Sequence, residues 1–483
     1  MKLTSKIAPN ELIEHVESLA KRPEPRNVQD ILDEILEEVK PVDFKEKLHE
    51  TRKRKLSEKD LQVISVQECI DTFSTKNYHV CQFQATIFIY NGCFWGRIGN
   101  EDFGKFLGIY SCKIGIDKFS ALHFTFKENL LKQFFSAGFL KVPDVNKELM
   151  FINLLNGTLE IGTNGIKFRR FNADDFLRYQ LPFELNPNAT RPIFQGYLDK
   201  VLPGKEEQHI LAEYLGYSLI RRSTKCPKVE KALLLYGSGS NGKSVFFEVV
   251  NAIFGEAHIS HISLGHLTDV NGYYRAGLAN KLINFASEIS TSFDINIFKQ
   301  IVSGEPTMSR LPNKPPVEIK EMATLIFNCN ELPRDVEHTW AFYRRLLIIN
   351  FGVQIPENEQ DKLLHRKIIN NELPGVFNWI LEGLKRFIGQ NGFTHSPSAE
   401  SYIKSYRVES DSVQLFMEEL NFEASISEYC LLRECYSSYR SFCLSDGYKP
   451  VNKTNFKKRL EGAGVAVERK NVGIVVFMRQ KSF

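Results

Sequence analysis

The stretch LLLYGSGSNGKSVFFEVVNAIFG, residues 233–255, runs from an apolar segment through a glycine-rich loop into a helix-like pattern. Its centre matches G-x-x-x-x-G-K-S, with Gly237, Gly242, Lys243 and Ser244 at the fixed positions. In such a loop the backbone N–H groups face the phosphates, the lysine reaches the β- and γ-phosphates, and the serine hydroxyl holds Mg²⁺. A chance glycine turn would not explain why a buried strand precedes the loop and a helix follows it. The stretch therefore predicts a binding site for a nucleoside triphosphate and Mg²⁺. The residues expected to contact the nucleotide are Gly237, Ser238, Gly239, Ser240, Asn241, Gly242, Lys243, Ser244 and Val245.

Polar residues end the next two long apolar runs. KLINFASEIS, residues 281–290, carries Glu288, and a carboxylate at the end of a neighbouring strand can orient the attacking water and help to hold Mg²⁺. ATLIFNCNELP, residues 323–333, ends in Asn328 and Asn330, and an asparagine there can contact the γ-phosphate or the water. A strand that ends in glutamate is common, so the assignment depends on the order of the motifs.

Two arginines, Arg344 and Arg345, enter a fourth apolar run. They are either a salt-bridged structural pair or arginine fingers that reach a phosphate bound by a neighbouring subunit. Lysine, glutamate, asparagine and arginine follow one another between residues 243 and 345, with no inserted lid. This compact order disfavours a nucleotide kinase, which needs a second substrate pocket and a closing lid.

Composition indicates the class of protein but not its partner. The chain has 483 residues, of which 43% are hydrophobic and 25% charged, as in ordinary soluble proteins of several domains. The net charge of +4 is small, so a site for nucleic acid must be a local basic patch. The nine cysteines form no C-x-x-C pair, which favours reduced thiols over a zinc site. No apolar run has the length of a membrane span. We expect a cytoplasmic protein, in a bacterium or in a host cell, that needs no membrane.

Changes in composition and residue pattern along the chain predict its domains. The first part is charged and helical and contains the basic run 52–55, which is either a solvated face or a phosphate contact. The next part alternates apolar and polar residues around Asn-Gly turns, as hairpins do. GQNGFTHSPSAES, residues 389–401, has the composition of a linker. The expected units are a charged helical segment at 1–62, a mixed α/β domain of unknown role at 63–185, a helical collar with the ATPase at 186–388, and a C-terminal domain at 402–483.

The C-terminal unit has the pattern of a winged helix. SVQLFMEELNF, YCLLRECYSSYRSFCLSDGY and TNFKKRLEGAG predict helices, and VAVERKNVGIVVFMRQ predicts a strand, a turn and a strand. Such a unit contacts either DNA or another protein. Its basic residues expected at DNA are Lys457, Lys458 and Arg469.

The order of these motifs resembles the superfamily 3 helicases, in particular the helicase portion of phage and plasmid primase–helicases related to the poxvirus type. The resemblance is carried by GSGSNGKS, NFASE, FKQIVSGEPTMSRLPNKPPVEI, IFNCNELP and FYRRLLIINF, with INLLNGTLEI and LPFELNPNATRPIFQGYLDKVLP upstream. It covers roughly residues 150–355. The implied fold is a multidomain α/β protein with a central P-loop ATPase core of the AAA+ class, an N-terminal mixed α/β region and a C-terminal winged-helix-like domain.

The resemblance also assigns roles at the phosphate site. Lys243 and Ser244 correspond to the Walker A pair, Glu288 to the Walker B acid and Asn330 to the sensor asparagine. Ser287 stands where many relatives have a second acid, so Mg²⁺ would be held by Ser244, Glu288 and water.

Members of this group form hexameric rings that move single-stranded DNA through a central pore. The arginine finger would be Arg344 or Arg345, with a slight preference for Arg345. A hairpin before the sensor strand carries basic residues to the pore, and here it corresponds to MSRLPNKPPVEI, with Arg310 and Lys314. Lys299 is a weaker candidate for the same path.

The sequence thus leads to an ATP-dependent DNA helicase of a phage or mobile element, a homo-oligomeric ring on single-stranded or forked DNA. A nucleotide-dependent origin-binding or assembly scaffold without processive unwinding is the alternative. The first 150 residues contain no primase motif, so any primase partner is expected on another polypeptide.

Overall fold

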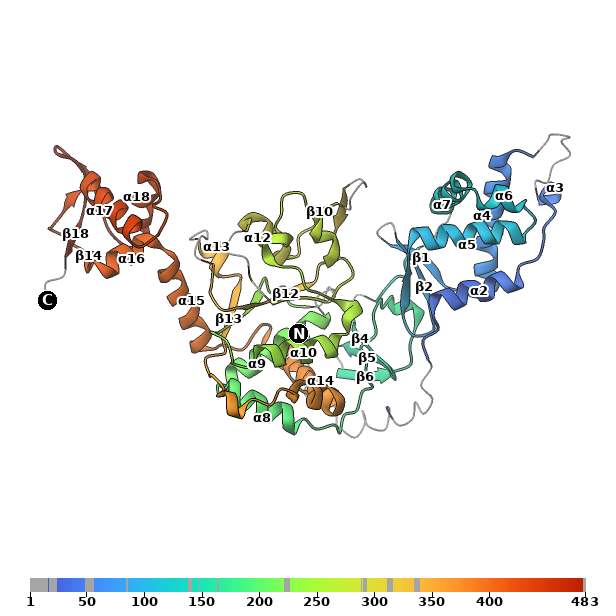
Figure 1. Ribbon diagram of the computed structural model, residues 1–483, viewed down its shortest axis with the longest axis horizontal. Helices are drawn as coiled ribbons and strands as arrows, with labels where there is room; N and C mark the ends of the chain where they lie inside the picture. The colour runs from blue at the N-terminus through green and yellow to red at the C-terminus, as the bar shows by residue number, and fades with distance from the viewer. Residues whose placement is uncertain are drawn as a thin grey trace.

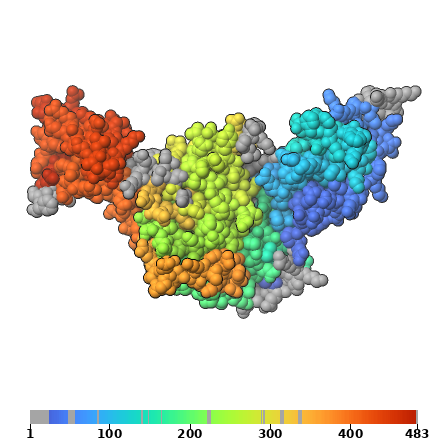
Figure 2. All heavy atoms as spheres, viewed as in Figure 1, coloured from blue at the N-terminus to red at the C-terminus, as the bar shows by residue number. Residues whose placement is uncertain are grey.

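Three bodies follow one another along the molecule. The computed structural model describes residues 16, 24–47, 56–83, 86–137, 141–146, 148–162, 165–220, 226–287, 289, 293–310, 316–333 and 339–480. Figure 1 shows a central body built on a sheet, with an N-terminal lobe on one side and a C-terminal lobe on the other. The space-filling view shows both lobes projecting from the central body (Figure 2).

The central sheet has five parallel strands. In chain order they are β7 (Ala232–Tyr236), β8 (Ile259–Ser260), β9 (Ile283–Ala286), β12 (Thr324–Cys329) and β13 (Leu346–Asn350). Their order in space is β13-β7-β12-β9-β8, so β12 lies between β7 and β9. Leu233 and Leu235 of β7 pack in one buried cluster and Ala232 and Leu234 in another. Both faces are therefore covered, as a parallel sheet made of apolar runs requires.

Helices cover the two faces in separate layers. One layer, below the sheet in Figure 1, consists of α8 (Pro192–Val201), α9 (Lys205–Ile220), α10 (Lys243–Phe254) and α14 (Leu364–Gln390). The other consists of α11 (Leu264–Leu267), α12 (Ile295–Ser303), α13 (Trp340–Tyr343) and α15 (Pro397–Ser410). A hairpin of β10 (Thr307–Ser309) and β11 (Val317–Ile319) projects beside α12. The expected strand and helix on either side of the phosphate loop are confirmed by β7 and α10.

The N-terminal lobe has its own core. Its strands are β1 (Val80–Phe83), β2 (Thr86–Tyr90) and β3 (Trp95–Ile98). Its helices are α2 (Val28–Glu38), α3 (Phe44–Lys47), α4 (Glu58–Thr75), α5 (Asn100–Lys113), α6 (Lys118–Leu122) and α7 (Phe124–Ala137). The expected boundary between residues 62 and 63 falls inside α4, whose capping box at Ser57 and Asp60 starts the helix before that point. The basic run 52–55 lies outside the described residues.

The expected boundary between residues 185 and 186 is also wrong. The antiparallel strands β4 (Met150–Leu154), β5 (Gly157–Gly162) and β6 (Gly165–Arg169) form a second sheet, as their alternation predicted. Leu159 and Phe168 of this sheet belong to the same buried cluster as Leu233 of the central sheet. The turn-rich segment before α8 is therefore a connection inside one hydrophobic core.

The expected linker at 389–401 is held in place. α14 continues to Gln390, and the buried carboxylate of Glu213 accepts hydrogen bonds from the backbone N–H of Thr394, at 2.7 Å, and from its hydroxyl. Ser396 then caps α15, whose Tyr406 is buried against the central sheet. A polar composition indicated solvent exposure, but these polar groups bind one another inside the structure.

The C-terminal lobe begins after α15 and has the expected elements. They are α16 (Ser412–Glu419), β14 (Phe422–Ala424), β15 (Cys430–Leu431), α17 (Leu432–Ser445), α18 (Lys453–Gly462), β16 (Val467–Lys470), β17 (Gly473–Val476) and β18 (Met478–Gln480). β17 pairs with both β15 and β16 in one sheet, and β14 pairs with β18. Within the described ranges, no helix combines the length and the apolar character that crossing a bilayer would require.

Close packing of α9 on α14 supports this architecture and can be tested at a glycine. A Cβ atom added to Gly383 would lie 2.4 Å from the carbonyl carbon of Ala212, so Gly383→Ala forces two backbones apart. We expect the free energy of unfolding to fall by about 1–3 kcal/mol, measured by urea denaturation followed by fluorescence. Gly389→Ala is the matched control, because Gly389 lies in the same helix with nothing within 4 Å of the added atom. Equal stability of the two variants would contradict the packing argument.

Candidate nucleotide-binding site

The glycine-rich loop leaves the carboxyl end of β7 and turns sharply into α10. Gly239 and Gly242 have φ angles of 108° and 87°, a region that favours glycine. A side chain at Gly242 would also meet Tyr197, since an added Cβ atom lies 2.9 Å from its ring. Both the backbone conformation and the contact with α8 therefore require glycine at this position.

Neighbouring elements fix the shape of the loop. Asn241 donates a hydrogen bond to the carbonyl oxygen of Phe351 at 2.9 Å, just after β13. The hydroxyl of Tyr197 donates to the carbonyl of Gly242 at 2.8 Å, and the N–H of Ile355 donates to the carbonyl of Ser240 at 2.8 Å. The sequence motifs do not include Tyr197, Phe351 or Ile355. Phe351 and Ile355 contribute backbone atoms, which leave no mark in the sequence, and Tyr197 reaches the loop from α8. These three contacts with neighbouring elements hold the loop in its observed conformation.

Lys243 is the centre of the site. Lys243 is buried, and burial lowers the pKa of its ammonium group. The ammonium nitrogen donates to the carbonyl oxygen of Gly237 and, at 3.2 Å, to Oδ1 of Asn330. Both acceptors are uncharged, so these two contacts leave the positive charge of Lys243 without an anion. The structure therefore brings together Lys243 and Asn330, which are far apart in sequence.

Strand order explains this contact. β12 lies directly beside β7, with Cys329 opposite Tyr236, so the carboxyl ends of the two strands meet at one edge of the sheet. Ser244 follows Lys243 in the first turn of α10 and is exposed at this edge. The placement of Glu288 lies outside the described residues.

Asn328 occupies a less expected position. It is 8% exposed, and its Oδ1 atom is buried with no hydrogen-bond partner among the described residues. Asn328 is the fifth residue of β12, and Asn330 follows Cys329, the last residue of that strand. On the other side of β12, Phe327 pairs with Ala286, which places Asn328 beside the end of β9 and Ser287. A buried acceptor without a partner at a phosphate site is suited to a bound water or ligand.

The two arginines differ in environment. Arg345 has a side chain that is 10% exposed, lies 3.0 Å from Glu230 and donates to Ser303 at 3.0 Å and to the carbonyl of Ala341 at 2.7 Å. Arg344 is 49% exposed and contacts Glu230 at 3.2 Å. The slight preference for Arg345 as a finger therefore conflicts with the geometry, because its guanidinium is already held inside the chain. The sequence could not separate the two, since they are adjacent.

Both arginines lie at the amino-terminal ends of the sheet strands, whereas the phosphate loop lies at their carboxyl-terminal ends. They directly precede β13, and Leu346 of that strand is opposite Ala232, the first residue of β7. The loop follows the last residue of β7, about 16 Å away for a strand of this length. Arg344 therefore does not face the phosphate loop of its own chain.

The basic residues expected at DNA are distributed over two bodies. Arg310 is exposed at the end of β10, and Lys314 lies outside the described residues. Lys299 is partly buried on α12. In the C-terminal lobe, Lys457 pairs with Glu461 at 3.6 Å.

The C-terminal lobe combines exposed basic residues with aromatic rings. Lys458 on α18 and Arg469 on β16 are exposed. The ammonium of Lys470 lies 4.0 Å from the ring centroid of Tyr429 and 4.7 Å from that of Phe477. No described contact links these basic residues to the phosphate loop.

Comparisons with family models give three matches along the chain. Residues 235–345 match a family of unknown function, DUF5906, and this range includes the phosphate loop, Asn330 and both arginines. Residues 117–203 match the family described as D5 N terminal like, and residues 408–471 match the family described as poxvirus D5 protein-like.

Curated relatives come from African swine fever virus. Proteins named "Putative primase C962R" in the Badajoz 1971 Vero-adapted strain and the Warthog/Namibia/Wart80/1980 isolate are each 24% identical over 342 residues, which is 63% of this chain. The match covers 34% of each viral protein, so the chain spans about a third of the length of these relatives.

Solved structures of similar extent are those of the NrS-1 C-terminal region. Two apo forms cover 86% of this chain and 98% or 99% of theirs, with 13% and 14% identity and TM-scores of 0.45 and 0.46.

Taken together, the two D5 family models and the viral relatives support a relationship of this chain to the poxvirus D5-like primase–helicase family.

Proposed function

We propose that the chain is an ATP-dependent DNA helicase of a phage or other mobile element, built on an AAA+ core of the superfamily 3 type. The observation that carries the proposal is the contact of Lys243 with Asn330 across adjacent parallel strands. The contact brings the lysine of a phosphate loop next to an asparagine at the end of the neighbouring strand. ATP hydrolysis at this class of site requires a phosphate-binding lysine and a polar residue that positions the water or the γ-phosphate. From the names of the D5-like relatives we extend only a role in DNA replication, because the chain spans about a third of the viral proteins.

The residues of the site have separate roles in this proposal. Lys243 binds the β- and γ-phosphates, and Asn330 positions the γ-phosphate or the attacking water. Ser244 and Glu288 would hold Mg²⁺, which neutralises phosphate charge when it is bound. The amide groups of the preformed loop bind the remaining phosphate oxygens.

Removal of the lysine tests the catalytic assignment. Lys243→Ala should abolish ATP hydrolysis, measured as phosphate release with and without single-stranded DNA, because Lys243 is the cation that joins Gly237 of the loop to Asn330 at the end of β12. The unchanged protein should hydrolyse ATP faster when DNA is present and should separate the strands of a forked duplex. Hydrolysis that ignores DNA, without strand separation, would instead favour the assembly scaffold.

We propose further that Arg344 acts on ATP bound by a neighbouring subunit. Its side chain is half exposed, and it lies at the edge of the sheet away from the phosphate loop of its own chain. Arg345 has a different role, since its contacts with Glu230 and Ser303 fix the start of β13. The proposal requires a closed oligomer, and a hexameric ring is the form that the resemblance implies.

A subunit-mixing experiment tests the action of Arg344. Arg344→Ala should lower kcat for ATP hydrolysis by about 10³-fold or more with little change in nucleotide affinity. Mixing this variant with Lys243→Ala should restore part of the activity, because one interface then combines an intact Lys243 with an intact Arg344. Arg345→Ala is the neighbouring control, and its main effect should be a lower melting temperature. Two inactive variants that stay inactive together would overturn the assignment.

DNA contacts complete the proposed function. The β10–β11 hairpin, with Arg310 and Lys314, would move along the strand, and Lys299 would contribute near its base. The exposed Lys458 and Arg469, with Lys457, form the basic part of a winged-helix-like lobe. Its aromatic and basic wing suits contact with phosphates and bases.

We propose that Asn328 takes over part of the role of the second acidic residue, which many relatives have at the position of Ser287. Ser287 has no carboxylate, and the unpartnered Oδ1 of Asn328 lies on the adjacent strand at the same edge. A neutral amide oxygen there can accept a hydrogen bond from a water bound to the metal.

Nucleotide binding with and without metal tests this role. Asn328→Leu should weaken the binding of a fluorescent ATP analogue about 10- to 100-fold in Mg²⁺ and much less in EDTA, because only the metal-dependent part is lost. Asn251→Leu serves as the control, since Asn251 also has a buried Oδ1 without a partner but lies in the last turns of α10. An equal loss of affinity in Mg²⁺ and in EDTA would exclude a contact through the metal.

A further inference from the structure

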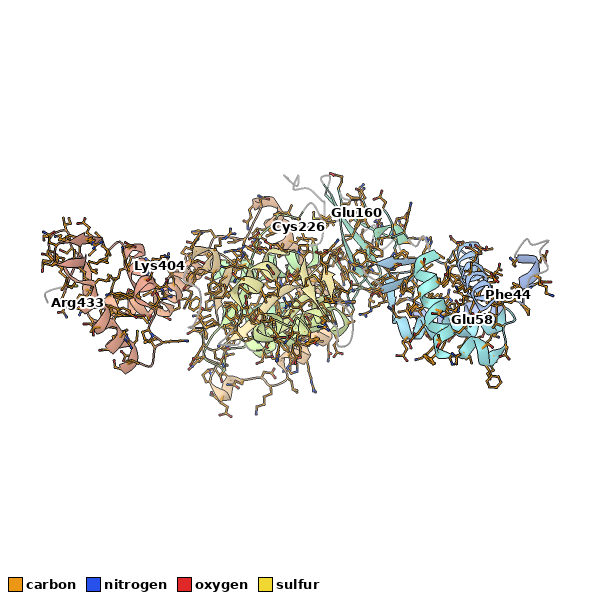
Figure 3. All side chains as sticks on the ribbon, turned by 90° about the horizontal axis from the view of Figure 1, so that it is seen from above. Phe44, Glu58, Glu160, Cys226, Lys404 and Arg433 are labelled. Atoms are coloured by element: carbon orange, nitrogen blue, oxygen red, sulfur yellow. The ribbon has the colours of Figure 1, made fainter. Side chains whose placement is uncertain are left out.

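A cavity separate from the phosphate loop lies on the outer face of the sheet formed by β4, β5 and β6. Figure 3 labels Glu160 of this sheet, in the part of the central body that adjoins the N-terminal lobe. The cavity has a volume of about 560 Å³, within the range of small-ligand sites. Its lining includes Phe151, Glu160, Arg169, Phe171, Asp174 and Asp175.

Arg169 is fully engaged in the wall of this cavity. Its guanidinium lies 2.8 Å from Glu160 and 2.7 Å from Oδ1 of Asp175, and it covers the ring of Phe151 at 5.1 Å. It also donates to the carbonyl oxygen of Arg170 at 3.1 Å. Arg169 therefore holds the wall together, and its charge is already balanced by two carboxylates.

Asp175 retains an unused acceptor in this wall. Its side chain is 6% exposed, and its Oδ2 atom is buried without a hydrogen-bond partner among the described residues. Burial raises the pKa of the Asp175 carboxyl. Leaving a buried acceptor unpaired costs free energy, so such an atom calls for a donor that the chain does not supply.

The backbone next to Asp175 is strained. Phe176 has φ 48° and ψ 39°, the left-handed region that an aromatic residue rarely adopts. Edge-on contacts with the rings of Phe83 and Trp95, each at 5.5 Å between centroids, hold it there. Backbone strain of this kind concentrates at ligand sites. It fixes the position of Asp175 in the wall.

The net charge of the lining residues indicates the kind of ligand that the cavity would bind. Four carboxylates, from Asp144, Glu160, Asp174 and Asp175, face two guanidinium groups, so the lining carries a formal charge of −2. This charge repels the phosphates of DNA and attracts a cation. Among the described residues, no group of three or more metal-ligating side chains is close enough to hold a metal ion. The cation expected here is therefore an organic one.

We propose that this cavity binds an arginine side chain presented by a protein partner. The planar guanidinium would pair with the carboxylate of Asp175, and it would stack on the half-buried ring of Phe171. An arginine fits better than a lysine, because several donors in one plane match a wall that holds both carboxylates and an aromatic ring. The site is independent of the ATPase, and it would bind a partner whether or not the chain unwinds DNA.

Peptide binding to the full chain tests the site. The probe is a fluorescein-labelled hexapeptide of alternating glycine and arginine, followed by fluorescence anisotropy at low salt. Asp175→Asn should weaken its binding at least 10-fold, because the variant keeps an acceptor for Arg169 but loses the charge. Asp174→Asn is the matched control, since it removes the same charge from the adjacent, exposed residue, and it should change binding less than 3-fold. The corresponding lysine peptide should bind more weakly than the arginine peptide.

Three results would overturn the proposal. They are equal losses in the two aspartate variants, absence of peptide binding, or Asp175-dependent binding of a labelled oligothymidylate. If Asp175→Asn lowers the melting temperature, Phe171→Ala provides the second variant, because it removes the stacking surface and leaves the Arg169 pairs intact. Unchanged peptide affinity in Phe171→Ala would then count against the site.

Discussion

The candidate site depends on one contact, in which the ammonium of Lys243 bridges the carbonyl of Gly237 and the amide of Asn330. The contact exists because β12 is inserted between β7 and β9, so that two strand ends distant in sequence meet beside the glycine-rich loop. Burial lowers the pKa of this ammonium, and both of its acceptors are neutral. A buried cation with only neutral partners is a favourable place for an anion to bind.

The scaffold around the site is continuous over a large part of the chain. The sheet of β4, β5 and β6 shares a hydrophobic core with the central sheet, and α9 and α14 pack so closely that glycine is required between them. Arg178 extends this continuity to the N-terminal lobe. It pairs with Glu321, just after β11, donates to Asn280 at 2.6 Å and lies 4.4 Å from the ring of Phe83. One buried guanidinium thus connects the base of the hairpin to a strand of the lobe.

Charge in this protein is local, which explains why its net value says little about its partners. A net charge of +4 conceals exposed basic residues in the C-terminal lobe and an acidic cavity on the sheet of β4, β5 and β6. Arg344 and Arg345 show the same effect at a smaller scale. They are adjacent in sequence and both approach Glu230, yet one guanidinium is exposed and the other is buried. Their different environments follow from where the chain enters β13.

The sequence by itself determined the local pieces. Spacing of glycine, lysine and serine specified the loop between β7 and α10, since backbone conformation and phosphate chemistry both constrain those positions. Alternation and helical periodicity likewise identified the strands of the second sheet and the elements of the C-terminal lobe. Only the tertiary structure decided the rest. Which strands are neighbours, where a domain ends and which arginine is exposed depend on contacts between residues far apart in the sequence, and composition does not specify those contacts. The boundary near residue 186 illustrates this, because the turn was correctly recognised and yet both sides of it share one core.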